Sequence, residues 1–230
     1  MWKAVLDFLF PPLCLRCGER LGEEERLVCE TCWERARRRD RWPISQGGDG
    51  PTEEECGPVV RARSANVWNE TLGEILHRFK YGGFILLGER LARGMAGTIV
   101  SDPALMRADL LVPVPLTRAR AAERGFNQSA VLARHISRLL GIPVAERAVR
   151  RVGRSRSQTK LSPEGRRKNV RGVFRVRDPS AVRGKRILIV DDVWTTGATA
   201  EELARALLGA GAREVSAIAA ARASGPRGSS

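Results

Sequence analysis

One stretch near the end of the chain constrains the fold more than any other. Residues 186–208, RILIVDDVWTTGATAEELARALL, run from an unbroken apolar segment through two adjacent acids and a Thr/Gly cluster into a segment with helical periodicity. At the carboxyl end of a parallel strand, such a cluster can surround an anion with backbone N–H groups and hydroxyls as the next helix begins. The loop that we expect to bind a phosphate consists of Thr195, Thr196, Gly197, Ala198 and Thr199.

Two carboxylates come directly before this loop. Asp191 and Asp192 can accept hydrogen bonds from the vicinal hydroxyls of a sugar and can favour a nearby divalent cation. A ribose 5-phosphate therefore fits both halves of the motif. Thr199 and Glu202 have the spacing of a capping box, which predicts that a helix starts at Thr199.

Other motifs that bind phosphates do not fit the stretch. A Walker A loop requires G-x-x-x-x-G-K-[ST] and a dinucleotide fingerprint requires G-x-G-x-x-G, and the stretch contains neither. A response-regulator receiver also places paired acids after an apolar strand. That fold needs several further strand–helix units, and too little chain follows Asp192 to form them. A site for a sugar phosphate is the interpretation that remains.

The preceding residues alternate between helical and strand-like patterns. Helical periodicity is present in residues 70–79, 88–100 and 127–141, with Gly141 as the expected C-terminal cap. Strands are predicted at residues 109–115, 173–176, 186–190 and 214–220. This alternation is typical of a largely parallel sheet. Residues 150–172 are polar and cationic throughout, and such a long stretch within a compact domain is usually a functional lid or disordered.

Four cysteines near the N-terminus have the spacing of a metal site. They are Cys14, Cys17, Cys29 and Cys32, in the pattern C-x2-C-x11-C-x2-C. Two C-x-x-C turns, brought together by a hairpin, can supply four thiolates to a tetrahedral zinc ion, and Gly18 fits the tight turn that this requires. We predict a structural zinc, because a closed four-sulfur site leaves no open coordination position; a redox dithiol is the alternative. Cys56 has no partner in the sequence and is expected to be a plain thiol.

Composition limits the partners and the compartment. The 230 residues carry a formal net charge of +14, so nucleic acid, anionic small molecules or both are expected partners. No window approaches the roughly 18 apolar residues needed to cross a bilayer. Residues 1–14 predict a short amphipathic helix rather than a secretory signal. An odd number of cysteines, four of them paired for a metal, favours a reducing compartment, and we predict a cytoplasmic protein.

The motifs together resemble a known family. ILIVDDVWTTGATA looks like the phosphoribosyl pyrophosphate motif of type I phosphoribosyltransferases. Residues 113–134, residues 157–174 and the cysteine pairs are, with it, similar to the ComF family of competence-associated proteins, and these blocks span nearly the whole chain. The resemblance implies an α/β fold, with a type I phosphoribosyltransferase-like parallel sheet flanked by helices and a small N-terminal zinc-ribbon-like module. Many relatives have a second cysteine cluster where this chain has only Cys56, so we expect one zinc ion.

Composition along the chain, together with the resemblance, also predicts how the chain divides. Residues 1–42 would form the zinc-binding module, and residues 43–60, which are rich in Gly, Pro and acids, a linker. Residues 61–222 would form the phosphoribosyltransferase-like domain, and residues 223–230 a disordered tail.

Site roles follow from the resemblance residue by residue. Asp191 and Asp192 would hold the ribose hydroxyls, and the loop from Thr195 to Thr199 the 5-phosphate. Magnesium would accompany the pyrophosphate group. Three arginines after the strand at residues 109–115 would neutralise the pyrophosphate, although any one of them can equally lie on a solvated helix face: Arg118, Arg120 and Arg124. The cationic stretch would close over the site as a lid, with a nucleic-acid contact or disorder as the competing views, and its candidate residues are Lys160, Arg166 and Asn169.

Three further residues are less informative. Lys80, in the block FKYGG, would approach the phosphates or lie on the surface. His77 and His135 are on helical patterns, and surface or packing roles are expected for both.

Two functions from different classes are consistent with these residues. The first is a magnesium-dependent enzyme that transfers a phosphoribosyl group from phosphoribosyl pyrophosphate to an acceptor that the sequence does not identify. The second is a non-catalytic competence protein that senses phosphoribosyl pyrophosphate and binds single-stranded DNA. The family's association with natural transformation implies a helicase-like partner and a DNA-protecting partner, and homodimers are common among phosphoribosyltransferases.

Overall fold

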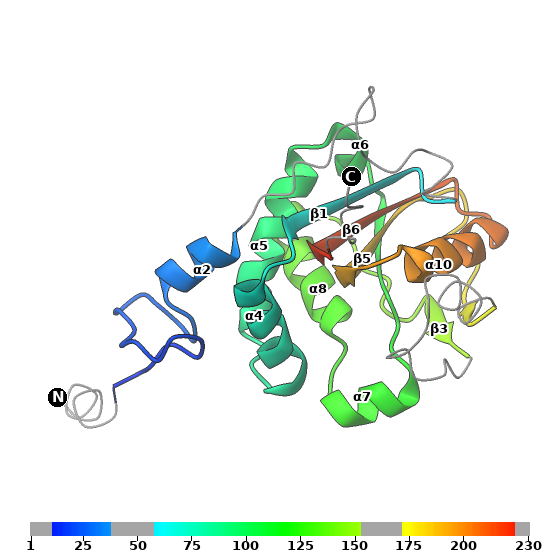
Figure 1. Cartoon of the computed structure of the whole chain (residues 1–230). Coiled ribbons are helices and arrows are strands. Elements are labelled where there is room, and N and C mark those ends of the chain that lie inside the picture. The colour runs from blue at the N-terminus through cyan, green and yellow to red at the C-terminus, as the bar shows by residue number, and fades with distance from the viewer. Residues whose placement is uncertain (1–10, 38–57, 153–171, 224–230) are drawn as a thin grey trace, which may run out of the picture.

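The computed structural model describes residues 11–37, 58–152 and 172–223 (Figure 1). Several predictions fall on residues outside these ranges. They concern the N-terminal helix up to residue 10, the linker up to residue 57 with Cys56, the tail from residue 224, and the three candidate lid residues Lys160, Arg166 and Asn169. In the described part of the chain, no helix has the length and apolar character needed to cross a membrane.

A four-stranded parallel sheet forms the centre of the fold, as the alternating pattern predicted. Its order is β1-β6-β5-β2, and the strands are β1 (Arg61–Val67), β2 (Leu110–Pro113), β5 (Arg186–Trp194) and β6 (Glu214–Arg222). The two central strands contain continuous buried runs, because both faces of a parallel sheet are covered by helices. β1 was not predicted, because RARSANV lacks the apolar run that marked the other strands.

Helices cover both faces of the sheet (Figure 1). α4 (Glu70–Tyr81), α5 (Leu87–Val100) and α8 (Gln128–Leu140) lie on one face, and α10 (Ala198–Gly209) lies on the other. Alternate residues of β5 divide between the two layers: Leu188 and Val190 pack toward α5 and α8, whereas Ile187 and Ile189 pack toward α10. Because successive side chains of a strand point to opposite faces, β5 contributes to the hydrophobic layers on both faces of the sheet.

Shorter elements surround this sheet. α6 (Pro103–Met106) follows α5, and α7 (Arg118–Arg124) follows β2. β3 (Val149–Arg151) and β4 (Phe174–Val176) form an antiparallel pair, with the cationic stretch between them in the sequence. β3 was not predicted, because its three residues include two arginines and show no apolar pattern.

The N-terminal module packs against the helical face of the domain. Its helix α2 (Glu30–Ala36) ends at α4, where the side-chain amide of Asn69 donates to the carbonyls of Arg35 and Ala36, both at 3.2 Å. The Arg90 guanidinium on α5 lies 5.2 Å from the centre of the Trp33 ring and pairs with Glu30. Trp33 is buried in the same core cluster as Leu72 and Ile75 of α4. The module and the domain therefore share one hydrophobic core.

One local prediction was wrong, and another was confirmed. The segment that carries Arg118, Arg120 and Arg124 forms helix α7, which Thr117 caps by accepting a hydrogen bond from the Arg120 N–H at 3.2 Å. Thr199 is not the cap of α10: Gly197 is, and the helix begins at Ala198. Glu202 does not complete a capping box, because its carboxylate accepts a hydrogen bond from the Gly172 N–H and pairs with Arg205. By contrast, Gly141 ends α8 in the left-handed conformation, as predicted.

Candidate functional site

The two acids lie near the carboxyl end of β5, a central strand. The Asp191 carboxylate accepts hydrogen bonds from the Ser129 hydroxyl at 3.1 Å and from the Asp192 N–H at 2.8 Å. Ser129 is in the first turn of α8 and is buried, so it holds one side of the Asp191 carboxyl group in place. The Asp192 carboxylate turns instead toward α4, where Lys80 Nζ lies 2.8 Å from its Oδ2 atom. The adjacent acids thus have different partners and different orientations.

Removal from water, with the charge of Asp192 as the second cause, raises the pKa of Asp191 to about 7. The Asp192 N–H, the Lys80 ammonium and the Ser129 hydroxyl oppose the shift, because each of them favours the ionised carboxylate. A carboxyl group with a pKa near neutrality gains or loses a proton easily when a cation or a ligand arrives. A perturbed acid of this kind is typical of a functional site.

The first turn of α10 lies directly after the acids. Gly197 has a φ of +77° and no side chain with which to cap the helix, so the first N–H groups of α10 are available to an anion. A Cβ atom on Gly197 would come within 2.8 Å of the Trp194 ring. Glycine is therefore required here both by the left-handed backbone and by the close approach of Trp194. Thr195 is exposed, whereas Thr196 and Thr199 are half-buried beside this turn.

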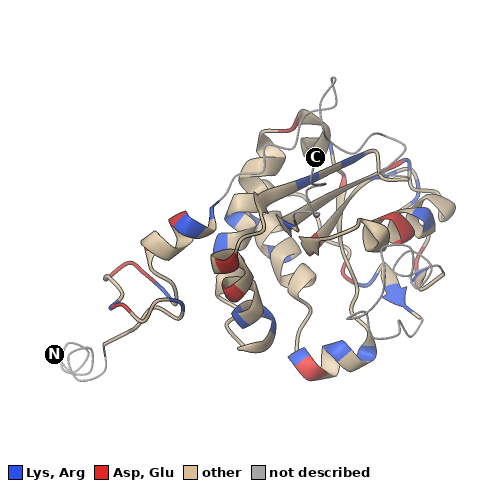
Figure 2. Ribbon diagram, in the orientation of Figure 1, with Lys and Arg blue, Asp and Glu red and all other residues tan. Residues whose placement is uncertain are grey.

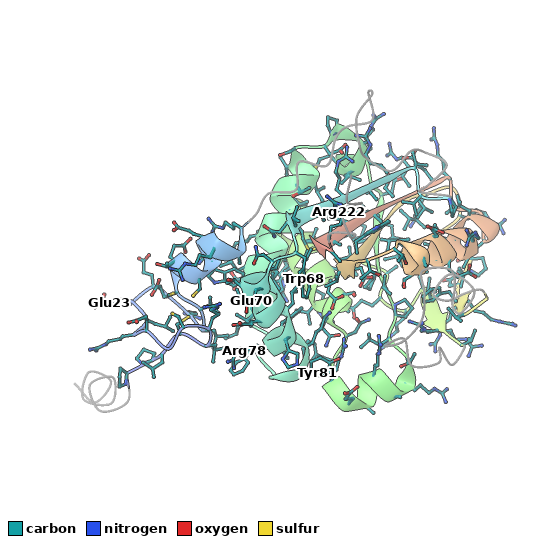
Figure 3. The ribbon with its side chains drawn as sticks, viewed as in Figure 1. Glu23, Trp68, Glu70, Arg78, Tyr81 and Arg222 are labelled. Atoms are coloured by element: carbon teal, nitrogen blue, oxygen red, sulfur yellow. The ribbon has the colours of Figure 1, made fainter. Side chains whose placement is uncertain are left out.

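A second polar network joins α4, α7 and α8 beside the acids. The Arg124 guanidinium donates to Gln128 Oε1 and to the Tyr81 hydroxyl, both at 2.8 Å, and lies 4.7 Å from the centre of the Tyr81 ring. Tyr81 is at the end of α4 that faces α7 (Figure 3). The buried side chain of Gln128 is also directed at the Lys80 carbonyl, 3.4 Å away. Arg124 and Lys80, both suggested by the sequence, therefore belong to one connected cluster.

Arginines approach the acids from two other elements. Arg118 and Arg120 are exposed on α7, on which Figure 2 shows basic segments and one acidic segment. Arg151, on β3, stacks over the Phe174 ring at 5.4 Å. Its pKa is lowered by burial and by the charge of Arg120, and raised by the charge of Asp191, so it lies within electrostatic reach of both. Its Nε atom is buried without a hydrogen-bond partner among the described residues. Two neighbouring cations such as Arg120 and Arg151 are better stabilised when an anion lies between them.

Sequence reasoning missed four residues of this constellation. They are Tyr81, Gln128, Ser129 and Arg151, each of which lies next to a residue or block that the motifs did single out. The histidines take the expected surface and packing roles: His77 is exposed with its ring 5.0 Å from that of Tyr81, and His135 is half-buried on α8.

The four cysteines converge, as their spacing predicted. The Sγ atoms of Cys14, Cys17, Cys29 and Cys32 all lie within 4.8 Å of one another. Gly18, with a φ of +77°, forms the turn after the first pair, and its N–H donates to the Cys14 carbonyl at 3.0 Å. Burial opposes ionisation of Cys14, but N–H groups of Cys17, Cys29 and Arg16 outweigh it and lower its pKa to about 6. Burial raises the pKa of Cys32, a thiol that a zinc ion would deprotonate.

Comparisons with known proteins agree with this geometry. A model of the phosphoribosyl transferase domain matches residues 127–228, and a model of the double zinc ribbon domain matches residues 5–45. The DNA utilization protein YhgH of Escherichia coli (strain K12) is 32% identical over 217 residues, which cover 89% of this chain and 94% of that protein. Competence protein F of Haemophilus influenzae is 33% identical over 159 residues, covering 67% and 69% of the two chains. Competence protein ComFC of Bacillus subtilis is 29% identical over 198 residues, covering 85% and 71%.

These matches explain both parts of the molecule. The parallel sheet with its flanking helices is a type I phosphoribosyltransferase-like fold, and the cysteine cluster is a zinc-ribbon centre suited to a structural zinc ion. Because YhgH, competence protein F and ComFC match the chain at 29–33% identity over 67–89% of its length, the chain belongs to the ComF family.

Proposed function

We propose that the chain binds phosphoribosyl pyrophosphate together with magnesium and transfers its 5-phosphoribosyl group to an acceptor. One observation carries this proposal: Asp191 and Asp192 lie just before a helix N-terminus whose cap, Gly197, offers N–H groups without a competing side chain. Carboxylates and a helix N-terminus at one strand end match the hydroxyl and phosphate ends of a ribose 5-phosphate.

Different residues around this strand end would bind different groups of the ligand. Asp191 and Asp192 accept hydrogen bonds from the ribose hydroxyls, and the loop from Thr195 to Thr199 surrounds the 5-phosphate. The pyrophosphate would bind to arginine side chains on α7 and β3, namely Arg118, Arg120, Arg124 and Arg151. Lys80 pairs with Asp192, so its ammonium group lies where it could also contact the phosphates of the ligand.

Paired carboxylates are ligands that suit a hard cation such as magnesium. Asp191 and Asp192 would hold the ion near the ribose, and when bound it would supply positive charge to the pyrophosphate leaving group. The chain's own residues bind and orient the sugar. We assign to Lys160, Arg166 and Asn169 the exclusion of water, because an oxocarbenium-like sugar without such cover would be captured by water.

Calorimetry with phosphoribosyl pyrophosphate tests the pocket. We expect the wild type to bind in the presence of magnesium and the Asp191→Ala/Asp192→Ala variant to lose binding. The matched control is Glu23→Ala/Glu24→Ala, which removes two adjacent exposed carboxylates from the N-terminal module and should bind as the wild type does. No binding by the folded wild type would contradict the proposal.

An alternative function would use the same phosphoribosyl pyrophosphate pocket. Relatives are named for competence and for DNA utilization, and this chain carries a formal net charge of +14. We therefore propose, as the alternative, a protein for DNA uptake that senses phosphoribosyl pyrophosphate and binds single-stranded DNA without catalysis. Pyrophosphate release separates the two functions: release with any base or nucleic acid supports the enzyme, and binding without release supports the sensor. DNA binding should weaken steeply with salt, and a flat salt dependence would count against it.

The remaining assignments are part of the same proposal. Residues 1–42 act as a zinc-binding module, residues 43–60 as a linker, residues 61–222 as the ligand-binding domain, and residues 223–230 as a tail. Helicase-like and DNA-protecting proteins are the partners that a role in DNA uptake would require, and homodimer formation is testable by sedimentation.

A further inference from the structure

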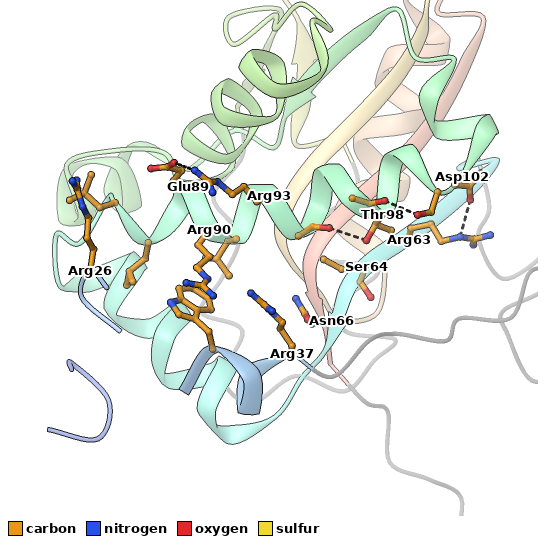
Figure 4. A pocket seen from close by; sticks show the side chains of 18 of the residues that line it. Arg26, Arg37, Arg63, Ser64, Asn66, Glu89, Arg90, Arg93, Thr98 and Asp102 are labelled. Carbon is orange, nitrogen blue, oxygen red and sulfur yellow. Dashed lines mark hydrogen bonds and ion pairs between the residues drawn. The ribbon is translucent and has the colours of Figure 1, made fainter. Parts of the chain in front are cut away.

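A groove of about 1250 Å³ opens between α2, α5 and β1 (Figure 4). It lies beside β1, whereas the candidate phosphoribosyl site lies at the end of β5, and β6 separates these two strands in the sheet. No residue that lines the groove is among those assigned to phosphoribosyl pyrophosphate. The groove is therefore a surface feature distinct from that site.

The groove is elongated and follows one face of α5. Its lining includes Arg90, Gly94 and Gly97, which are three or four residues apart and so share one face of the helix. The 14 residues of α5 make a helix about 20 Å long. Figure 4 shows Arg26 at one end of the groove and Arg63 at the other. A groove of this length fits an extended polymer better than a single small anion.

Two glycines keep the α5 side of the groove open. Gly94 and Gly97 are exposed in the interior of α5, where glycine lowers helix stability relative to alanine. A Cβ atom on Gly97 would meet nothing within 4 Å, and one on Gly94 would meet only the Cβ of Ala65, at 3.8 Å. Packing within the described residues therefore requires neither glycine, and both leave space for a ligand.

Arginines supply the charge of the groove. Six of them line it: Arg26, Arg37, Arg61, Arg63, Arg90 and Arg93. Two carboxylates are each shared by two of these arginines, namely Asp102 by Arg61 and Arg63, and Glu30 by Arg37 and Arg90. Six arginines face four carboxylates, those of Glu24, Glu30, Glu89 and Asp102, which leaves an excess of two positive charges.

Several of these arginines can turn to a ligand. The Arg93 side chain is 67% exposed and pairs with Glu89, whose side chain is 49% exposed. The Arg37 side chain is 56% exposed. Ion pairs as exposed as these contribute little to stability, so a phosphate can replace the carboxylate at small cost. Arg26 is exposed and makes no ion pair with any residue that the structure describes.

We propose that this groove binds a single strand of nucleic acid, whose phosphates lie along the arginines. Proteins that bind single strands combine a positively charged groove with groups on which bases stack. Arg90 is such a group, because its guanidinium is held 5.2 Å from the centre of the Trp33 ring and a guanidinium plane can stack on a base. The inference rests on the DNA-binding alternative proposed above and gives it a place on the protein.

The chemistry of the groove favours a nucleic acid over an acidic peptide. Among the described residues, every cation in its lining is an arginine. A guanidinium binds a phosphate or a carboxylate bidentately and also stacks on bases, whereas a peptide of Asp and Glu uses only the first property. A single strand is favoured over a duplex, because its backbone can follow a groove while its unstacked bases remain available for contact.

Fluorescence anisotropy with fluorescein-labelled oligo(dT) tests the proposal on the full-length, zinc-loaded protein. Arg37→Ala/Arg93→Ala removes two exposed cations of the groove and should weaken binding at low salt by at least about tenfold. The slope of log K against log[salt] should fall in magnitude by about 0.7 for each lost phosphate contact, hence by about 1.4 for this variant. Its matched control, Arg78→Ala/Arg138→Ala, makes the same change in net charge outside the groove and should bind as the wild type does.

A second variant closes the groove without changing its charge. Gly97→Gln adds a neutral side chain where the structure shows open space, and it should weaken oligo(dT) binding by at least about tenfold. Gly209→Gln, at the end of α10, also adds a side chain where a Cβ meets nothing within 4 Å, and it should bind as the wild type does. Glutamine has a higher helix propensity than glycine, so thermal unfolding should show both proteins folded. Calorimetry should find phosphoribosyl pyrophosphate binding unchanged in all these variants.

Oligo(rU) of the same length distinguishes RNA from DNA as the source of the strand, and groove-dependent binding of either supports the proposal. Three outcomes would overturn it. If oligo(dT) binds the wild type and both groove variants equally, the DNA-binding alternative stands but its site is another surface. If neither oligonucleotide binds the wild type, the alternative and the groove fail together. If labelled poly-glutamate binds more tightly than both oligonucleotides and loses binding in Gly97→Gln, the partner is an acidic protein segment.

Discussion

The Lys80 ammonium lies 2.8 Å from the Asp192 carboxylate and joins the end of α4 to the end of β5. Both side chains are largely shielded, with exposed fractions of 19% for Lys80 and 14% for Asp192. The carboxylate that we assign to the ribose therefore already has a cation beside it before any ligand arrives. A ligand that engages Asp192 must compete with this ion pair or include Lys80 among its contacts.

Lys80→Met should weaken both the fold and the binding of phosphoribosyl pyrophosphate. The substitution leaves the shielded Asp192 carboxylate without its cation, and we expect a loss of about 1–3 kcal/mol in the free energy of unfolding. Binding should weaken by about tenfold or more if Lys80 also meets the phosphates. Urea unfolding and calorimetry measure the two effects. Arg78→Met, which removes an exposed cation from the same helix, is the control, and equal behaviour of the two variants would rule out the role of Lys80.

Binding of magnesium and phosphoribosyl pyrophosphate should strengthen as the pH rises through about 7. Burial and the Asp192 charge raise the pKa of Asp191 to about 7, and the ionised form is the one that accepts hydrogen bonds from hydroxyls or holds a cation. Calorimetry on either side of this pH measures the change. Asp191→Asn should abolish the pH dependence, and a wild-type affinity that stays constant across this range would contradict the assignment.

The same pKa has a consequence for stability. Asp191 has a folded pKa above its ordinary value of 3.8, so it stabilises the fold fully below that value, and this contribution is lost as the pH rises through about 7. The wild type should therefore lose stability relative to Asp191→Asn between about pH 4 and pH 8. Ser129→Ala should move the midpoint to higher pH, because the Ser129 hydroxyl favours the ionised form. Ser137→Ala, on the same helix, serves as the control.

Gly197→Ala should damage the phosphate loop. The residue has a φ of +77°, and an added Cβ would come within 2.8 Å of the Trp194 ring. We expect a loss of about 1–3 kcal/mol in stability and a marked loss of phosphoribosyl pyrophosphate binding. The control is Gly209→Ala at the end of the same helix, where a Cβ meets nothing within 4 Å. Thermal unfolding should show no loss there, and a small gain would be consistent with the higher helix propensity of alanine.

Metal analysis should find one zinc ion per chain. Cys29→Ser removes one of the four converging thiols and should abolish stoichiometric zinc, with increased proteolysis of the N-terminal module. Because Trp33 shares its core with α4, melting of the domain should also shift downward. Cys56→Ser should leave the zinc content unchanged. Two zinc ions in the wild type, or none in a folded preparation, would refute the prediction.

Local sequence was sufficient for the elements whose signals are contained in short segments. The apolar run of β5, the helical period of α8 and the cysteine pairs each predicted their own structure, because hydrophobic periodicity and metal-ligand spacing act over a few residues. The family resemblance added the order of the parts. The same reasoning failed at β1 and β3, whose arginine-rich sequences form strands only because neighbouring strands supply the pairing and the cover.

The sequence by itself therefore determined the class of fold, the cysteine cluster and the strand end at which the acids lie. Only the tertiary structure decided the partners of those acids, since Ser129 and Lys80 reach Asp191 and Asp192 from helices that are far away along the chain. It alone also placed Arg151 near Arg120, and brought α2, α5 and β1 together around an arginine-lined groove. Each of these contacts depends on how separate elements pack, and side-chain burial and electrostatics at such junctions are set by neighbours that no local pattern specifies.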